Sequence, residues 1–117
     1  MADFKRANRV AKLMKQEISQ IISRELKDPR VVMATVTKVK LTDNLSFARI
    51  FVSIMGDEKV KQNTLEGLNV AKNFIRTELG HRTGLKFVPD ISFYYDDSID
   101  YAQNIESLIK KIHDDER

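Results

Sequence analysis

The sequence of 117 residues contains no cysteine and no tryptophan, and it has only two prolines and four glycines. Without cysteine the chain can form neither a disulfide nor a thiolate metal site, so we expect a reducing compartment, the cytoplasm. The glycines, at positions 56, 67, 80 and 84, never cluster, which excludes the glycine-rich loops that hold dinucleotides and nucleoside triphosphates. No run of about 18 apolar residues occurs, and the charged N-terminal segment lacks the apolar core of a secretory signal. We therefore expect no membrane association.

Residues that could support catalysis or metal binding are few. His81 and His113 lie in polar surroundings near the ends of predicted elements, which favours solvated positions over catalysis. Asp96, Asp97 and Asp100 cluster in one loop, where carboxylates can hold a hard cation. Their spacing departs from a calcium-binding loop, because a tyrosine and a serine stand where its glycine and closing glutamate are required. Capping of a following helix explains these carboxylates more simply, so we expect no metal, no other cofactor and no enzymatic activity.

Positive charge is concentrated in the N-terminal half of the chain. Residues 1–50 contain 11 Lys and Arg against 5 Asp and Glu, whereas residues 96–117 contain 3 against 7. The whole chain has a net charge of +3. A basic N-terminal half suits a polyanionic partner such as nucleic acid, and an acidic tail can limit indiscriminate binding or stay solvated.

Three stretches have apolar residues at helical spacing. Residues 5–26 predict a helix that ends before Pro29, because a proline pushes the preceding residue out of the helical conformation. Residues 60–79 predict a helical region with a break inside it, since Gly67, Asn69 and Asn73 are poor helix residues. The segment from Gly80 to Gly84 is predicted to form a C-terminal cap and a loop. Residues 98–112 predict a final amphipathic helix.

Three segments rich in β-branched and aromatic residues are predicted strands: Thr35 to Leu41, Ser46 to Met55 and Asp90 to Tyr95. A turn at residues 42–44 joins the first two. Alternation in the second strand gives a core face of Ala48, Ile50, Val52 and Ile54 and a less apolar face of Phe47, Arg49, Phe51 and Ser53. The order of elements predicts an α+β sandwich with helices covering one face of a three-stranded sheet.

The first predicted helix also carries a series of basic residues. Lys5, Arg9, Lys12 and Lys15, with Arg6 nearby, follow steps of three and four residues and can share one face. Such a face is either an ordinary solvated helix surface or a site that neutralises RNA phosphates, which adds affinity without sequence information.

Several short motifs occur in a specific order and spacing. They are ELKDPR at residues 25–30, FIR at 74–76 followed by LG at 79–80, and VP at 88–89 followed by FYYD at 93–96. With these motifs nearly the whole chain resembles ribosome-binding factor A. The resemblance implies an α+β fold of the type II K-homology (KH) class, α-β-β-α-kink-α-β, with a mixed three-stranded sheet and an appended C-terminal helix.

The same resemblance implies a bacterial cytoplasmic protein that binds the free small (30S) ribosomal subunit or its precursor. Its role would be to assist late maturation of that subunit and processing of 16S rRNA. We expect a KH-like RNA-binding domain over residues 1–97 and a C-terminal helix with an acidic tail over residues 98–117. No feature demands a dimer, so we expect a monomer.

Members of that family carry an Ala-x-Gly motif at a kink between two helices, in place of the GxxG loop of other KH domains. The matching positions are Ala71-Lys72-Asn73, so asparagine stands in place of glycine. Asparagine can adopt left-handed backbone angles but adds a side chain where RNA would approach. Ala71 fits a small core residue equally well. The predicted RNA-binding residues are Lys5, Arg6, Arg9, Lys12, Ala71, Lys72, Asn73, Arg76, Arg82 and Lys86.

Two alternatives from other functional classes remain open. The first is a protein-interaction adaptor that uses the face of Phe47 and Phe51 or the acidic C-terminal helix. The second is a small phosphatase on a similar α+β sandwich, although the sequence has no anion-binding loop with a nucleophile.

Overall fold

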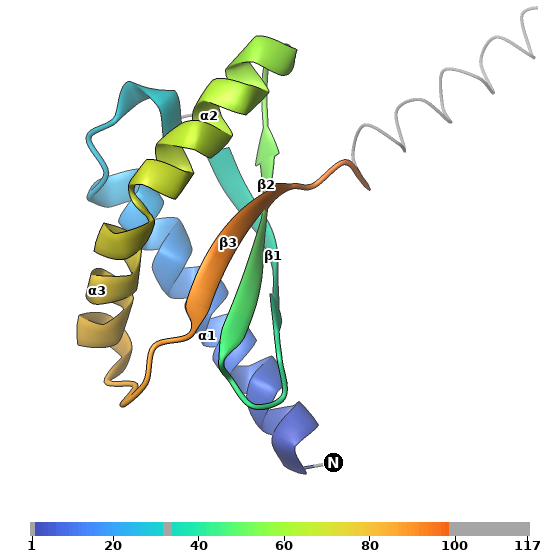
Figure 1. Cartoon of the computed structure of the whole chain (residues 1–117), viewed down its shortest axis with the longest axis vertical. Helices are drawn as coiled ribbons and strands as arrows, with labels where there is room; N and C mark the ends of the chain where they lie inside the picture. Colours follow the sequence, from blue (N-terminus) through green and yellow to red (C-terminus); the bar gives the residue numbers. More distant parts are fainter. Residues whose placement is uncertain (1, 32–33, 99–117) are drawn as a thin grey trace, which may run out of the picture.

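Helices and strands follow the predicted order in the computed structural model, which describes residues 2–31 and 34–98 (Figure 1). Their bounds are α1 Ala2–Arg24, the short 3₁₀ helix η1 Pro29–Val31, β1 Ala34–Leu41, β2 Phe47–Ile54, α2 Glu58–Val70, α3 Lys72–Thr83 and β3 Asp90–Tyr95. This order confirms the predicted α+β class. The predicted final helix and acidic tail fall almost wholly on residues 99–117, outside the described part of the chain.

The central strand of the sheet is β2, with β1 antiparallel on one side and β3 parallel on the other. The sheet is therefore mixed, as predicted. A parallel pair needs a long crossover connection, and α2 with α3 forms it between β2 and β3. The pairing of β1 with β2 shifts between Val36 and Lys38, which leaves Thr37 in a bulge. The Thr37 hydroxyl donates a hydrogen bond of 2.5 Å to Oδ2 of Asp96, at the end of β3.

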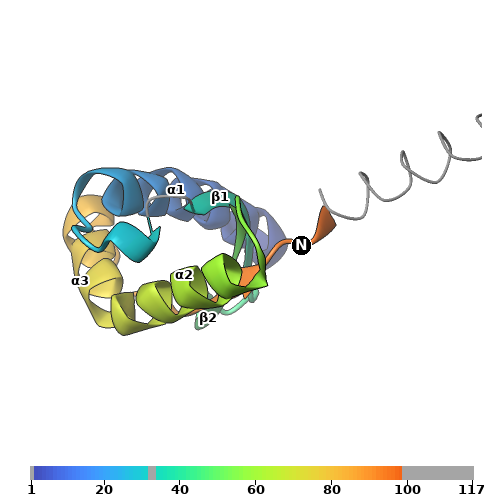
Figure 2. The same ribbon diagram turned by 90° about the horizontal axis from the view of Figure 1, so that it is seen from above.

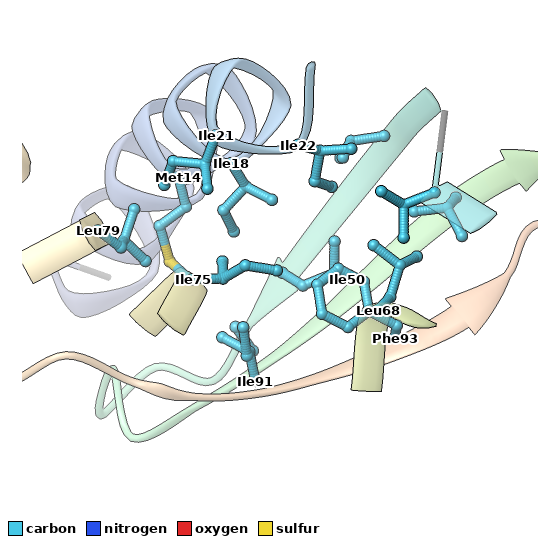
Figure 3. Packing of buried hydrophobic residues seen from close by; sticks show 14 of the residues in the cluster. Met14, Ile18, Ile21, Ile22, Ile50, Leu68, Ile75, Leu79, Ile91 and Phe93 are labelled. Carbon is cyan, nitrogen blue, oxygen red and sulfur yellow. The ribbon is translucent and has the colours of Figure 1, made fainter. Parts of the chain in front are cut away.

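All three helices lie on one side of the sheet and pack against it around a common core (Figure 2; Figure 3). From α1, Met14, Ile18 and Ile21 are fully buried. The predicted core face of β2 is confirmed, because Ala48, Ile50, Val52 and Ile54 are all buried. The alternate residues of β2 are half-buried or exposed. One face of the sheet is thus packed, and the described helices leave the other uncovered.

The crossover is interrupted at Ala71, between α2 and α3. Ala71 has φ −82° and ψ 0°, in the sparsely populated bridge region beside the helical one. The break predicted within residues 60–79 is confirmed. Asn73 does not use left-handed angles, because Leu45 is the only non-glycine with positive φ among residues 2–31 and 34–98. Asn73 therefore fits the start of α3 without left-handed backbone strain.

The end of α3 differs from the prediction, which placed the cap and loop at residues 80–84. The helix continues through Thr83, and Gly84 is its C-cap with φ 67°. The Gly84 amide donates to the Gly80 carbonyl at 3.0 Å, and glycine adopts this left-handed conformation without the steric cost that a side chain incurs. Gly80 itself is helical, and Val88 packs against it: a Cβ at position 80 would lie 3.0 Å from Cγ2 of Val88.

Candidate nucleic-acid interface

Four of the cations of α1, Lys5, Arg9, Lys12 and Lys15, lie within an arc of about 120° on the helix, and Arg6 lies outside it. An α-helix turns about 100° per residue, so Arg9 points away from the buried Ile18. Lys12 and Lys15 lie on the side that faces β1, where they line a groove together with Lys38. Arg6 lies on the opposite side of the helix. The predicted α1 residues are all exposed, and Lys5, Arg9 and Lys12 present positive charge on one side of the helix.

A cationic groove runs along the boundary between α1 and β1. Two adjoining depressions share Asn8 and Val39, one between α1 and β1 and one reaching to the β1–β2 turn. We call their basic lining the α1–β1 groove; its cations are Lys12, Lys15, Lys38, Lys40 and Arg49. No Asp or Glu lines either depression among the described residues. Because opposing charge is absent, this groove is suited to hold phosphate groups.

Arg6 and Lys86, two predicted residues from distant parts of the sequence, line the same hollow. It lies between the start of α1, the β1–β2 turn and the loop after α3, and Asp43 and Phe87 also line it. Phe87 is 79% exposed, and the Lys86 ammonium lies 5.5 Å from the centre of its ring. This hollow is thus a second basic surface, beside the start of α1, although the carboxylate of Asp43 reduces its positive charge.

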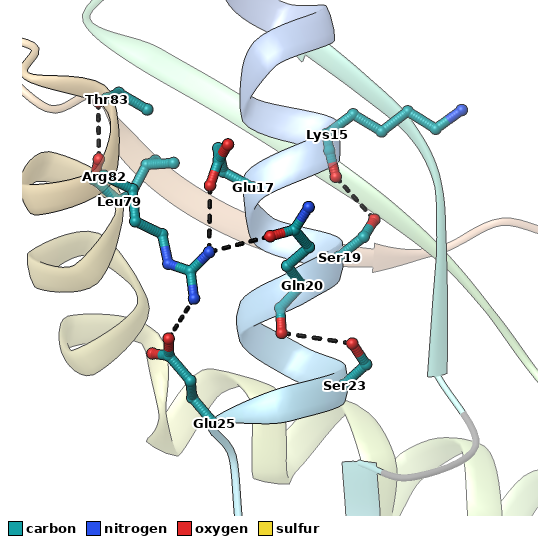
Figure 4. Close-up of polar contacts among 9 residues, drawn as sticks. All are labelled: Lys15, Glu17, Ser19, Gln20, Ser23, Glu25, Leu79, Arg82 and Thr83. Carbon is teal, nitrogen blue, oxygen red and sulfur yellow. Dashed lines mark hydrogen bonds and ion pairs between the residues drawn. The ribbon is translucent and has the colours of Figure 1, made fainter.

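Arg82 makes intramolecular contacts between α3 and α1 (Figure 4). Its Nη1 lies 3.2 Å from Oε2 of Glu17 and 3.1 Å from Oε1 of Gln20. Its Nη2 donates to Glu25. The hydrogen bond to Glu25, which has the larger effect, and the hydrogen bond to Glu17 raise the pKa of Arg82 above its ordinary value. Because these acceptors already hold the guanidinium, the geometry favours a role in joining the two helices over the predicted phosphate contact.

Arg76 is also held within the protein. Its Nε donates to the Pro89 carbonyl at 3.1 Å, and Nη2 donates to the Val88 carbonyl at 3.2 Å. Its Nη1 lies 3.6 Å from Oδ1 of Asp90. These contacts fix the segment that leads into β3, so Arg76 orients this strand and is poorly placed to leave it for RNA.

The predicted kink residues present a small polar surface. Asn73 is exposed, whereas Lys72 and Ala71 are half-buried. Ala71 packs against the hydrophobic core, which agrees with its alternative interpretation as a small core residue. In Figure 1 the α2–α3 junction lies apart from the N-terminal half of α1. The predicted kink residues therefore do not extend the α1–β1 groove.

Asp96 and Asp97, the described residues of the predicted acidic cluster, do not by themselves form a metal site. Asp96 accepts hydrogen bonds from the Ser98 amide at 3.0 Å and from Thr37. Bonds to Ser98 and Thr37 lower the pKa of Asp96 to about 2. Among residues 2–31 and 34–98, no cluster of three or more acidic, histidine or cysteine side chains could hold a metal ion. Asp100, the third carboxylate of the predicted cluster, lies outside these residues.

Lys38, Lys40 and Arg49 line the α1–β1 groove but were not among the predicted site residues. Alternation along the strands shows that these side chains point away from the core, but it does not show which side of which helix lies beside them.

No helix in the described part of the chain combines the length and apolar character needed to span a membrane.

Comparison with known proteins agrees with this fold. The model of a family described as ribosome-binding factor A matches residues 6–109. The crystal structure of ribosome-binding factor A from Thermus thermophilus is similar, with a TM-score of 0.69, 22% identity and coverage of 76% of this chain and 93% of that chain. A Thermus thermophilus factor fitted into the cryo-EM map of a 30S complex has a TM-score of 0.64, 23% identity and coverage of 74% and 91%.

A third similar structure comes from Thermotoga maritima, in a protein assigned to the same factor and determined by solution NMR. It has a TM-score of 0.63 and 30% identity, and the match covers 76% of this chain and 89% of that chain. All three structures thus share the fold described above over most of their length.

Proposed function

The chain belongs to the ribosome-binding factor A family, and from this premise we propose that it binds the free 30S ribosomal subunit or its precursor in the cytoplasm. There it assists late maturation of the subunit and processing of 16S rRNA. The family match over residues 6–109 is the observation that carries this proposal. A related Thermus thermophilus protein has been fitted into a map of a 30S complex, which supports the same partner for this chain.

The α1–β1 groove and the neighbouring α1 cations supply the binding surface. Lys5, Arg9 and Lys12 are exposed and can neutralise phosphates of folded rRNA, which releases counterions. Arg6 and Lys86 extend this surface at the start of α1, and Lys72 with Asn73 forms a separate contact at the kink. Arg76 and Arg82 act indirectly, because their contacts hold β3 and α3 in place.

The protein acts by binding and needs no covalent chemistry. A monomer that binds one rRNA conformation more tightly than another shifts the equilibrium toward it, by an amount set by the difference in affinity. A rigid surface is suited to this task, because it loses little conformational freedom on binding. The helices that bear the cations are fixed by a shared core.

A salt titration of binding to purified 30S subunits tests this proposal. Six phosphate contacts would lower the affinity roughly 10³-fold between 50 and 200 mM salt. The double variant Arg9→Glu/Lys12→Glu should bind more weakly and show a smaller salt dependence, by about one unit of log–log slope for each phosphate that is no longer neutralised. Its melting temperature should stay close to that of the wild type, because both side chains are exposed.

Lys59→Glu is the matched control, because Lys59 is exposed on α2, away from these basic surfaces. It should leave binding nearly unchanged. An affinity that is independent of salt, or equal reductions for Lys59→Glu and the α1 variant, would contradict the proposed electrostatic contact. Complexes that survive nuclease treatment of a lysate would favour the adaptor alternative.

A further inference from the structure

An aromatic pair lies on the sheet face that the described helices leave uncovered. Because Ile50 and Val52 point into the core, Phe51 between them points to the other face. Phe51 and Tyr94 are direct neighbours in the parallel register of β2 and β3. Their ring centres are 5.7 Å apart, with an angle of 30° between the ring planes. Tyr94 is 42% exposed, so part of its ring is open to a ligand.

Basic side chains surround this pair. The Lys38 ammonium lies 4.7 Å from the centre of the Phe51 ring, and the Lys40 ammonium lies 5.8 Å from it. Arg49 is exposed and pairs with Lys40 across β1 and β2. These cations come from strand positions that alternate with core residues, so they and the rings share one face. We call this surface the aromatic sheet face: Lys38, Lys40, Arg49, Phe51 and Tyr94.

Two carboxylates at the ends of β3 already have partners. Asp90, at the start of β3, lies 3.6 Å from Nη1 of Arg76. Asp96, at the other end of the strand, accepts hydrogen bonds from Thr37 and Ser98. The centre of the face therefore keeps its positive charge beside an exposed ring.

We propose that the aromatic sheet face is a second RNA site, which binds unpaired nucleotides of a single-stranded segment. Bases stack on aromatic rings while nearby cations hold the backbone phosphates, and this combination is typical of surfaces that bind single strands. Tyr94 is the stacking platform, Phe51 supports it from the side, and Lys38 with Lys40 reaches phosphates. A double helix keeps its base faces stacked inside, so it cannot use the ring in this way.

Charge complementarity favours RNA over an apolar protein partner, because binding such a partner would desolvate three cations without compensation. The inference depends on the proposed function in one respect, namely that the partner is RNA. It adds a distinct site and a distinct RNA class: α1 takes phosphates of folded rRNA, and the sheet takes unpaired bases. Lys38 and Lys40 also border the α1–β1 groove, so one RNA strand can pass from one surface to the other.

The test uses a fluorescently labelled eight-nucleotide single-stranded RNA of mixed sequence, with binding to the full chain followed by anisotropy. Tyr94→Ala should weaken binding roughly 5- to 150-fold, the range expected when one stacked base loses its platform. Tyr94→Phe keeps the ring and should bind within about twofold of the wild type. Phe74→Ala is the matched control, because Phe74 is 45% exposed but lies on α3.

The role of the cations is tested separately by Lys38→Gln/Lys40→Gln. This variant should reduce the salt slope of oligonucleotide binding by about 0.7 for each phosphate that a lysine no longer neutralises. The control Lys59→Gln should leave the slope unchanged. Thermal melts of all variants establish that the fold is retained, and Tyr94→Phe separates removal of the ring from removal of the hydroxyl.

Parallel measurements separate this inference from the proposed function. Arg9→Glu should reduce binding to 30S subunits while keeping most of the oligonucleotide affinity, and Tyr94→Ala should do the reverse. Equal oligonucleotide binding by the wild type and Tyr94→Ala would overturn the inference and leave the proposed function standing. A peptide with the sequence of residues 96–117, which contains 7 Asp and Glu against 3 Lys and Arg, represents an acidic protein occupant. Binding of this peptide to the face without binding of RNA would also overturn the inference.

Discussion

The connection between β2 and α2 contains a glycine that the structure makes difficult to replace. Gly56 has φ 138°, and a Cβ at this position would lie 2.7 Å from Cγ1 and 2.8 Å from Cβ of Val60. Gly56→Ala therefore adds backbone strain of about 1–3 kcal/mol and overpacking of about 1–3 kcal/mol. The expected decrease in the free energy of unfolding is about 2–6 kcal/mol.

Two further variants separate these contributions. Gly84→Ala meets a left-handed backbone with φ 67°, but no atom lies within 4 Å of the added Cβ, so it should lower stability by only about 1–2 kcal/mol. Adding Val60→Ala to Gly56→Ala removes the contact with Cγ1 but leaves the Cβ of residue 60 at 2.8 Å, so it should recover only part of the overpacking cost, which a double-mutant cycle measures. Val60 is 37% exposed, so its own truncation should cost little.

Urea unfolding, followed by circular dichroism, gives the free energies of unfolding of the wild type, the three single variants and the double variant on one scale. The free energy of unfolding should be lowest for Gly56→Ala, higher for Gly56→Ala/Val60→Ala and highest for Gly84→Ala. Equal decreases for Gly56→Ala and Gly84→Ala would refute the steric argument. A double variant no more stable than Gly56→Ala would refute the assignment of part of the overlap to the Cγ atoms of Val60.

Three other predictions follow from single side chains. Ile75→Ala, at a fully buried position of α3, should lower the free energy of unfolding by about 2–5 kcal/mol in urea; a decrease below about 1 kcal/mol would contradict its core position. Arg82→Gln should release α3 from Glu17 and Glu25, so hydrogen exchange should accelerate at the last amides of α3 and stay unchanged in β2; uniform acceleration would contradict a local contact. The pKa of Asp96 is lowered from 3.8 to about 2, so its contribution to stability is present above pH 3.8 and is lost as the pH falls toward 2. Asp96→Asn should therefore flatten the pH dependence of urea stability in this window, and an unchanged profile would contradict the assignment.

Periodic patterns predicted the parts of the fold that depend on local sequence. The apolar spacing of α1 and the alternation of β2 could be interpreted from the sequence because each pattern depends only on which side chains face the core. The burial of these side chains confirms both predictions. The end of α3 was predicted wrongly, because Gly80 and Gly84 are both plausible caps in the local sequence. In the structure Gly80 is helical, with Val88 packed against it, and Gly84 is the C-cap with φ 67°.

The candidate site was harder to predict because charge alone does not reveal a partner. Arg82 and Arg76 have the same charge as Arg9, but their acceptors come from residues far away in the sequence. Lys38 and Lys40 belong to the candidate site because the fold places β1 beside α1. Tyr94 was assigned to a strand without a functional role, since its neighbour Phe51 belongs to a strand much earlier in the chain.

The central claim is that cations on α1 and β1 contact rRNA directly, and crosslinking to purified free 30S subunits tests it most directly. With linked nucleotides and residues mapped, the account predicts rRNA crosslinks from Lys5, Lys12 and Lys38, and few or none from Lys59 on α2. Crosslinks confined to ribosomal proteins, or a pattern in which Lys59 reacts with rRNA as strongly as Lys12, would contradict it.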